Sequence, residues 1–169
     1  MKNQNKLFLI CPDCYLENRI TKNFSGRLYF STALGAVFTP IKFNYAESLN
    51  GIINREDIRE LYVVNDVACR FINTIIEDGE GFNTKEEKIL KKLYLDNSDA
   101  IIHQIERKHK STELAKLNIQ QQINELKKAE FIGSKFESGF LTIKGLLYDR
   151  NTLKFEELDF TKPSHESAS

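Results

Sequence analysis

The stretch Lys6–Cys14, KLFLICPDC, places two cysteines and an aspartate at the end of an apolar run. Consecutive apolar residues bounded by a proline are typical of a buried strand in a parallel sheet. Cys11 then lies at the carboxyl end of that strand, with Asp13 and Cys14 just beyond it. Because ligands of open α/β sheets bind outside the carboxyl ends of the strands, we expect these side chains to do chemistry rather than packing.

A second stretch, Leu61–Cys69 (LYVVNDVAC), repeats the arrangement, since a β-branched run is followed by Asp66 and Cys69. If the two strands are neighbours, Cys11, Asp66 and Cys69 converge at one edge of the sheet. Two thiolates and a carboxylate suit a zinc ion, so we predict a zinc site with these three ligands. The alternatives are plain buried cysteines and an aspartate that caps the following helix.

Cys14 leaves two further interpretations open. Together with Cys11 it forms a C-x-x-C motif, which would complete a closed four-coordinate zinc site with Cys69 and Asp66. The same motif at the start of a helix would instead suit thiol–disulfide exchange. The β-α unit that normally precedes such a redox motif is missing from this chain, which argues against a thiol–disulfide oxidoreductase.

Length, charge and hydropathy limit the class of protein. The 169 residues fit one domain, which we assign to residues 1–160, followed by a polar tail over residues 161–169. The 24 basic and 24 acidic side chains are mixed along the chain, which argues against nucleic acid or an anionic membrane as a partner. No stretch reaches the roughly 20 apolar residues that cross a bilayer, and the amino-terminal apolar run is too short for an export signal. We expect a cytoplasmic protein.

The order of the element signals predicts an α/β fold, with a mainly parallel central sheet flanked by helices and a carboxyl-terminal β-hairpin. Strands are expected at Lys6–Cys11, Arg27–Phe38, Leu61–Asn65, Phe131–Phe136, Gly139–Tyr148 and Thr152–Leu158. Helices are expected at Tyr45–Ile53, at Phe71–Ile76, from a capping box at Thr84 to beyond His103, and at Ser111–Lys128. The histidines His103 and His109 lie in charged segments and are expected to face solvent.

These features resemble the β-class carbonic anhydrases over residues 6–158. The first strand of that family ends in C-x-D-S-R, and the sequence CPDCY at residues 11–15 keeps the cysteine and the aspartate. The family's H-x-x-C-G motif corresponds to DVACR at residues 66–70, where the histidine is aspartate and the glycine is arginine. The sequence GFLTIKGLLYD at residues 139–149 is similar to the family's closing hairpin.

The resemblance implies a function and a partner. It implies that zinc is held by Cys11, Asp66 and Cys69, that Asp13 lies at the catalytic position, and that a zinc-bound hydroxide reversibly hydrates carbon dioxide to bicarbonate. It also implies a homodimer, because the family buries its site at a dimer contact. We expect the contact at the strand edge near Leu28–Phe38, which would otherwise be left unpaired.

Departures from the family motifs predict weak catalysis. Two thiolates and a carboxylate give a zinc site a net negative charge, where two thiolates and an imidazole give none, and a more negative site holds the proton of its water more tightly. The arginine that pairs with Asp13 in the family is replaced by Tyr15, so Asp13 is expected to be unrestrained and able to occupy the open metal position. A scaffold that has lost catalysis is therefore a third interpretation.

Overall fold

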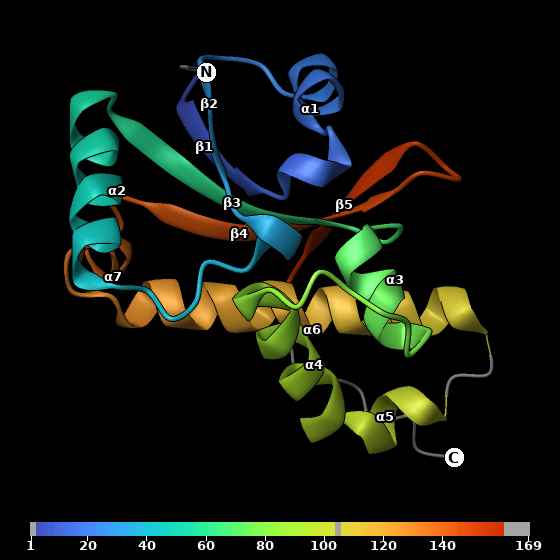
Figure 1. Ribbon diagram of the computed structural model, residues 1–169. Coiled ribbons are helices and arrows are strands. Elements are labelled where there is room, and N and C mark those ends of the chain that lie inside the picture. The colour runs from blue at the N-terminus through green and yellow to red at the C-terminus, as the bar shows by residue number, and fades with distance from the viewer. Residues whose placement is uncertain (1–2, 104–105, 161–169) are drawn as a thin grey trace, which may run out of the picture.

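The computed structural model describes residues 3–103 and 106–160, and its centre is a five-stranded sheet (Figure 1). The predicted polar tail over residues 161–169 lies outside that range. The strands are β1 (Asn5–Ile10), β2 (Leu28–Thr32), β3 (Ile58–Asp66), β4 (Thr142–Asp149) and β5 (Lys154–Leu158). Their order is β2-β1-β3-β4-β5, and every pair is parallel except the β4–β5 hairpin. The predicted α/β fold with a mainly parallel sheet and a carboxyl-terminal hairpin is confirmed.

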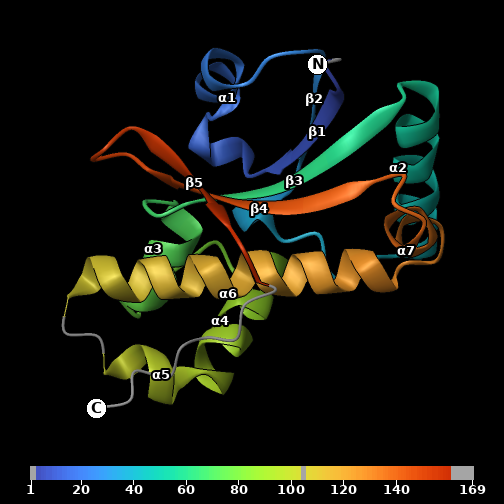
Figure 2. The ribbon, with the colours of Figure 1, turned by 180° about the vertical axis from the view of Figure 1, so that it is seen from behind.

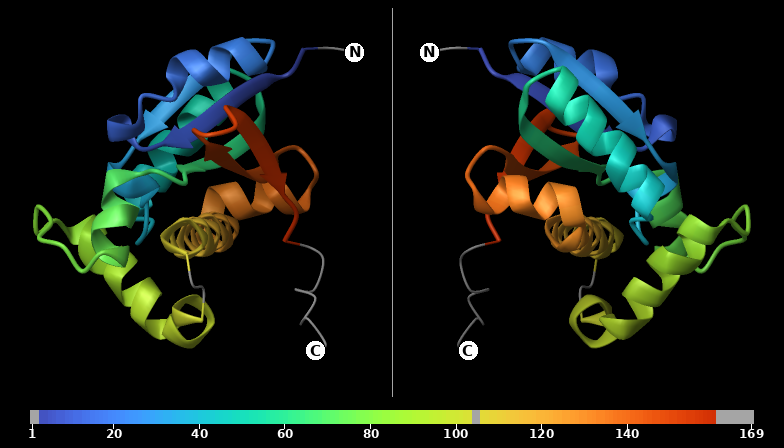
Figure 3. Two further views of the ribbon diagram at one scale, coloured as in Figure 1. Left: turned by 90° about the vertical axis from the view of Figure 1, so that its right-hand side faces the viewer. Right: turned by 90° about the vertical axis from the view of Figure 1, so that its left-hand side faces the viewer.

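Helices cover the two faces of this sheet unequally. They are α1 (Glu17–Asn23), α2 (Phe43–Arg55), α3 (Arg70–Ile76), α4 (Lys85–Asp96), α5 (Ser98–Ile102), α6 (Arg107–Lys128) and α7 (Glu130–Glu137). The long helix α6 runs across one face and packs on β3 and β4, with α3 and α4 on the same side (Figure 2). The short helix α1 lies over the opposite face, as the two side views show (Figure 3). No helix in the described part of the chain is long and apolar enough to cross a membrane.

The strand β1 forms the centre of the core. Its residues Leu7–Ile10 are at most 1% exposed although successive side chains point to opposite faces. On the face that carries α1, the Phe8 ring stacks on Tyr62 at 4.9 Å between ring centroids and meets Phe24 edge-on at 5.1 Å. Burial on both faces explains why the sequence shows a continuous apolar run here instead of alternation.

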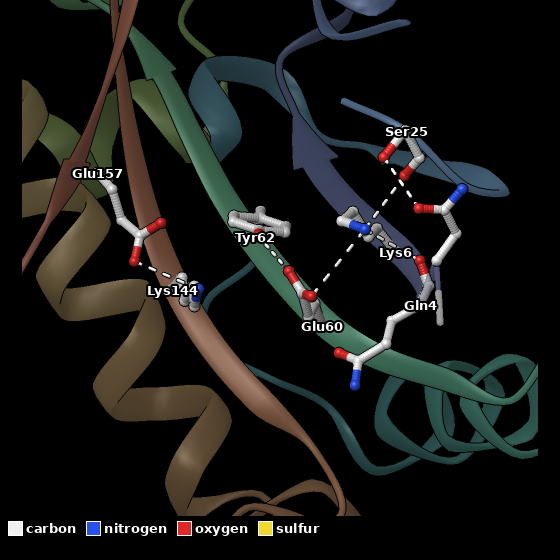
Figure 4. A network of polar contacts seen from close by, with 8 residues as sticks. Gln4, Lys6, Ser25, Glu60, Tyr62, Lys144 and Glu157 are labelled. Atoms are coloured by element: carbon white, nitrogen blue, oxygen red, sulfur yellow. Dashed lines mark hydrogen bonds and ion pairs between the residues drawn. The ribbon is translucent and has the colours of Figure 1, made fainter. Parts of the chain in front are cut away.

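Charged side chains border this aromatic core on the same sheet (Figure 4). Lys6 on β1 faces Glu60 on β3 in the strand register, with 4.0 Å between the ammonium nitrogen and a carboxylate oxygen. The Tyr62 hydroxyl donates to the same carboxylate, and Lys144 on β4 pairs with Glu157 on β5 at 3.4 Å. These cross-strand pairs give strands β1, β3, β4 and β5 a partly exposed polar strip beside the aromatic core.

One predicted strand is wrong, because residues 131–136 belong to helix α7. The chain breaks helix α6 at Ala129, whose backbone is extended, and then turns into α7 with Ile132 and Gly133 buried. A side chain at Gly133 would come within 2.2 Å of the Lys127 carbonyl oxygen, so the glycine permits the tight joint between the two helices. A short apolar run cannot be assigned to a helix or a strand by its period alone, and here the packing against α6 and α2 decides.

Two other predicted elements are shorter than expected. The strand predicted over 27–38 ends at Thr32, after which the chain forms the 3-10 turn η2 (Leu34–Ala36). The helix predicted from Thr84 ends at Asp96 and a separate helix, α5, follows it. The capping box itself is confirmed, since the Thr84 hydroxyl accepts from the Glu87 N–H and the Glu87 carboxylate accepts from the Thr84 N–H.

Candidate metal centre

The three cysteines come together at the carboxyl ends of β1 and β3. Cys11 follows β1, Cys14 ends the 3-10 turn η1 (Pro12–Cys14), and Cys69 directly precedes α3. Their sulfur atoms all lie within 4.8 Å of one another, and the three residues are 1%, 3% and 1% exposed. We call this group the sulfur triad.

Strand pairing and two tight turns position the triad. Strands β1 and β3 are parallel neighbours, with Leu9 opposite Val63, so both chains leave the sheet at the same edge. The proline after Cys11 starts the turn η1, in which the Cys14 N–H donates to the Cys11 carbonyl at 3.2 Å. This turn folds Cys14 back toward Cys11. Both cysteines of the C-x-x-C motif therefore lie beside Cys69, which follows β3.

The donor set of the triad fits a zinc ion. Zinc binds thiolate sulfur at about 2.3 Å, which places the sulfurs of a tetrahedral site about 3.8 Å apart. The spacing of the triad, with every pair of sulfurs inside 4.8 Å, is close enough to reach that geometry with small side-chain adjustments. No disulfide links the three cysteines, so all of them are free to act as ligands.

Hydrogen bonds within the triad distribute its protons unevenly. The Cys11 sulfur is the acceptor for the thiols of Cys14 and Cys69, and these bonds lower the pKa of Cys11 to about 3. The backbone N–H of Gly35 donates to the same sulfur at 3.2 Å. The hydrogen bond to Cys11 raises the pKa of Cys69 to about 12 and raises the pKa of Cys14 as well, and burial adds to both shifts. These opposite shifts favour Cys11 as the sulfur that carries negative charge in the metal-free triad.

Buried amides hold the Gly35 backbone against Cys11. The Gly35 carbonyl accepts from the side-chain amides of Asn65 at 3.2 Å and Asn118 at 3.1 Å, and Asn118 also donates to the Asn65 oxygen at 2.8 Å. Gly35 has a φ of +64°, and a Cβ there would lie 2.9 Å from a methyl carbon of Leu90. Glycine suits this position for two reasons. Residues with a side chain rarely adopt this positive φ, and a Cβ here would collide with Leu90.

Helix α6 anchors the rest of the same loop through Gln122. Its amide oxygen accepts from the N–H groups of Phe38 at 2.8 Å and Thr39 at 3.1 Å, and its amide nitrogen donates to Asn118 at 3.2 Å. The supporting roles of Asn118 and Gln122 were not predicted from the sequence. Their spacing is the signal that could have identified them. Residues four apart lie on the same face of a helix, and the other buried residues on this face of α6 are mostly apolar, so two amides there indicate buried hydrogen bonds.

Asp66 lies near the strand end as predicted, but its carboxylate is engaged elsewhere. One oxygen accepts from the Arg150 guanidinium at 2.6 Å and the other from the Ala68 N–H at 2.8 Å. Burial raises the pKa of the Asp66 carboxyl, and these two bonds oppose part of that rise. Arg150 also donates to the Cys14 carbonyl at 2.8 Å, so the pair braces the C-x-x-C turn. The sulfur triad does not include the Asp66 carboxylate, so a role for Asp66 as a metal ligand stays a prediction.

Asp13 is restrained by an arginine, so the expectation of an unrestrained carboxylate is wrong. Arg70 donates to the Asp13 carboxylate at 2.8 Å and lies over the Phe82 ring at 5.0 Å. This arginine stands where the family motif has glycine, so a residue on α3 replaces the partner that was lost at Tyr15. His103 and His109 are both exposed, as the sequence predicts.

Comparisons with known proteins agree with the fold. A profile of the family described as carbonic anhydrase matches residues 6–154. No curated protein matches the sequence. Several solved β-carbonic anhydrases are similar in fold, at identities too low to show more than the fold.

Three of these structures illustrate the likeness. CafA of the fungal pathogen Aspergillus fumigatus has a TM-score of 0.81 and 16% identity, covering 95% of this chain and 78% of that one. A tetrameric β-carbonic anhydrase of the filamentous ascomycete Sordaria macrospora has a TM-score of 0.80 and 15% identity, covering 94% and 82%. The Coccomyxa enzyme in complex with acetazolamide has a TM-score of 0.75 and 15% identity, covering 92% and 72%.

The proton distribution in the triad predicts how zinc binding depends on pH. Because Cys14 and Cys69 hold their protons near neutral pH while Cys11 is a thiolate, one zinc ion should displace about two protons. As the pH rises toward the raised pKa values of Cys14 and Cys69, the apparent affinity for zinc should then increase about 100-fold per pH unit. Titration calorimetry in buffers of different ionisation enthalpy measures the number of protons released per zinc ion. Release of three protons would show that Cys11 is also a thiol, and would contradict this assignment.

The amide contacts behind Cys11 predict a loss of metal affinity when they are removed. Asn118→Ala removes one of the two amides that bind the Gly35 carbonyl, together with the hydrogen bond that orients the other amide, Asn65. The Gly35 N–H that supports the Cys11 thiolate is then less firmly held. We expect a fall in zinc affinity of roughly 10–100-fold, measured by competition with a chelator. Gln120→Ala on the exposed face of the same helix is the matched control. Equal affinities in two folded variants would refute a supporting role for Asn118.

Proposed function

This chain belongs to the β-carbonic anhydrase family, and from that premise we propose that it binds one zinc ion through Cys11, Cys14 and Cys69 and hydrates carbon dioxide only weakly. The observation that carries the proposal is the convergence of three buried sulfurs at the strand ends where the family motifs lie. The single residue that departs from the family's ligand set, Asp66, is paired with Arg150 instead of pointing into the triad. The three thiols are thus the ligands that the described geometry favours.

The ligand charge sets the expected level of activity. When bound, zinc acts as a Lewis acid that acidifies water at an open position, and each added anionic ligand weakens that effect. Three thiolates leave the centre with a net negative charge, as would the predicted set of two thiolates and Asp66. Slow hydration of carbon dioxide near neutral pH is therefore expected whether the third anionic ligand is Cys14 or Asp66.

The residues around the triad have separate proposed roles. Asp13 occupies the proposed catalytic position, and its ion pair with Arg70 holds the carboxylate away from an open metal position. Arg150 fixes the backbone of Cys14, and Gly35 supports the charge on Cys11. If Asp66 left Arg150 and completed the site, the centre would be closed and purely structural.

The two alternative functions differ in how well the site supports them. Thiol–disulfide exchange needs a sulfur that a second protein can reach, and all three sulfurs belong to residues that are at most 3% exposed. A scaffold without catalysis is better supported, because the family's histidine is absent and the third thiolate weakens the metal as an acid. The free thiols favour a reducing compartment, and we propose that the protein acts in the cytoplasm.

Rebuilding the family's ligand set tests this proposal. The wild-type protein should contain about one zinc per chain and hydrate carbon dioxide slowly at neutral pH, with a rate that rises toward alkaline pH. The double substitution Cys14→Ser with Asp66→His removes one thiolate and supplies the imidazole. Because one pKa unit changes the deprotonated fraction about tenfold, we expect at least a tenfold higher rate at neutral pH in a stopped-flow assay.

Controls separate the possible outcomes of that assay. Asp66→His alone keeps all three thiols and adds a fourth ligand, which would close the site, so it should give no gain in rate. Asp66→Ala should retain zinc if the cysteines suffice. Brisk turnover of the wild type at neutral pH would contradict the charge argument. A native protein that folds and associates equally well without metal would establish the scaffold interpretation instead.

Self-association is the second property that we propose, and the difference between the two edges of the sheet supports a contact at β2. The edge strand β5 has the sequence KFEEL with three charged residues, whereas the opposite edge β2 has the sequence LYFST with none. Uncharged edges readily pair with another chain, so we propose a homodimer formed through β2.

A charge on that edge should weaken the dimer. Thr32→Lys places an ammonium on an exposed position of β2, and we expect a dissociation constant raised at least about tenfold in sedimentation experiments. Thr152→Lys in the exposed turn between β4 and β5 is the matched control and should leave association unchanged. A wild-type protein that remains monomeric at high concentration would contradict the proposed dimer.

A further inference from the structure

We infer that the sulfur triad prefers thiophilic ions to zinc, and that Cys14 is the residue that sets this preference. The ligand class is a soft cation that accepts three thiolates, for which cadmium is a suitable probe because its charge equals that of zinc. The inference rests on the metal site of the proposed function and is independent of catalytic activity.

The donor atoms of the site are the first support for this preference. Sulfur ligands select soft ions, whereas nitrogen and oxygen ligands suit harder ones. The triad contributes three sulfurs, and no histidine or carboxylate joins it within the described chain. The family's serine at the position of Cys14 would leave two thiolates, so a single residue changes the site from mixed donors to sulfur alone.

Ion pairs keep the neighbouring carboxylates from acting as ligands. Asp13 is bound to Arg70 at 2.8 Å, and Asp66 is bound to Arg150 at 2.6 Å. The side chain of Asp66 is fully buried, so its release would leave a charged group without a partner, which is costly. The Asp66 carboxylate is therefore committed to arginine. Asp13, whose side chain is 25% exposed, is drawn toward Arg70, so the three sulfurs are the fully buried donors that an ion contacts.

Burial adds to the preference. All three cysteines are at most 3% exposed, so an ion bound by the triad lies largely away from bulk water, although Cys14 also lines a cavity with Tyr148 and Arg150. Harder ions retain several water ligands, which a buried group of sulfurs does not replace. The Gly35 N–H that donates to Cys11 stabilises negative charge on sulfur without adding an oxygen donor. Because cadmium is softer than zinc, it gains more than zinc does from binding to the three thiolates of this site.

The backbone around Cys14 makes a clean substitution possible. Its carbonyl accepts from Arg150 at 2.8 Å and its N–H donates to the Cys11 carbonyl at 3.2 Å, and neither contact uses the side chain. Cys14→Ser should therefore keep the turn and change only the donor atom. The variant tests the role of the third sulfur without moving the other two.

The experiment is a competition between cadmium and zinc for the metal-free protein. The readout is the charge-transfer absorbance of cadmium–thiolate bonds, which zinc does not give. We expect the cadmium-to-zinc affinity ratio of the wild type to exceed that of Cys14→Ser by at least about tenfold. Gln120→Ala, on the exposed face of α6, is the matched control and should retain the wild-type ratio.

A second measurement guards against a variant that fails to fold. The cadmium NMR shift of the loaded wild-type protein reports the number of sulfur donors directly, and we expect the value of a three-sulfur site. Equal ratios in the wild type and Cys14→Ser, or a shift typical of two sulfurs, would overturn the inference while leaving zinc binding and weak hydration intact. A wild type that binds neither ion would overturn this inference and the proposed function together.

Discussion

The parallel pairing of β1 with β3 is the constraint on which the site depends. Cys11 directly follows β1, and Cys69 follows shortly after the end of β3. Because the two strands are parallel neighbours, their ends lie close together at the same edge of the sheet. The apolar run of β1 secures this pairing, because its side chains are buried on both faces. The same residues therefore drive folding and fix the distance between Cys11 and Cys69, while the turn after Pro12 brings Cys14 into the group.

Charge balance explains the ion pairs around the triad. Asp66 is buried and needs a cationic partner, since a buried carboxylate without one is costly, and the partly exposed Asp13 also pairs with an arginine. Arg70 and Arg150 supply these partners at 2.8 and 2.6 Å, from positions 57 and 84 residues away in the sequence. If the triad binds zinc as we propose, its three thiolates would favour holding the metal over activating water.

Local patterns were sufficient to predict the sheet, the carboxyl-terminal hairpin and the strand ends that carry the cysteines, because each follows from a run of neighbouring residues. Helix α7 was missed because a short run containing Phe131 and Ile132 has no period that separates a helix from a strand. The partners of Asp13 and Asp66 were missed because both arginines become neighbours only after the chain folds. Cys14 was recognised as a possible ligand, but the choice between it and Asp66 depends on Arg150.

The count of sulfur ligands at the metal tests the central claim most directly. X-ray absorption spectroscopy at the zinc edge of the purified, metal-loaded protein measures the number and the distances of sulfur and lighter donor atoms. We predict three sulfurs at about 2.3 Å, and two sulfurs after Cys14→Ser. A wild-type centre with two sulfurs and two oxygen or nitrogen donors would contradict the proposed ligand set, and would return Asp66 to it in place of Cys14.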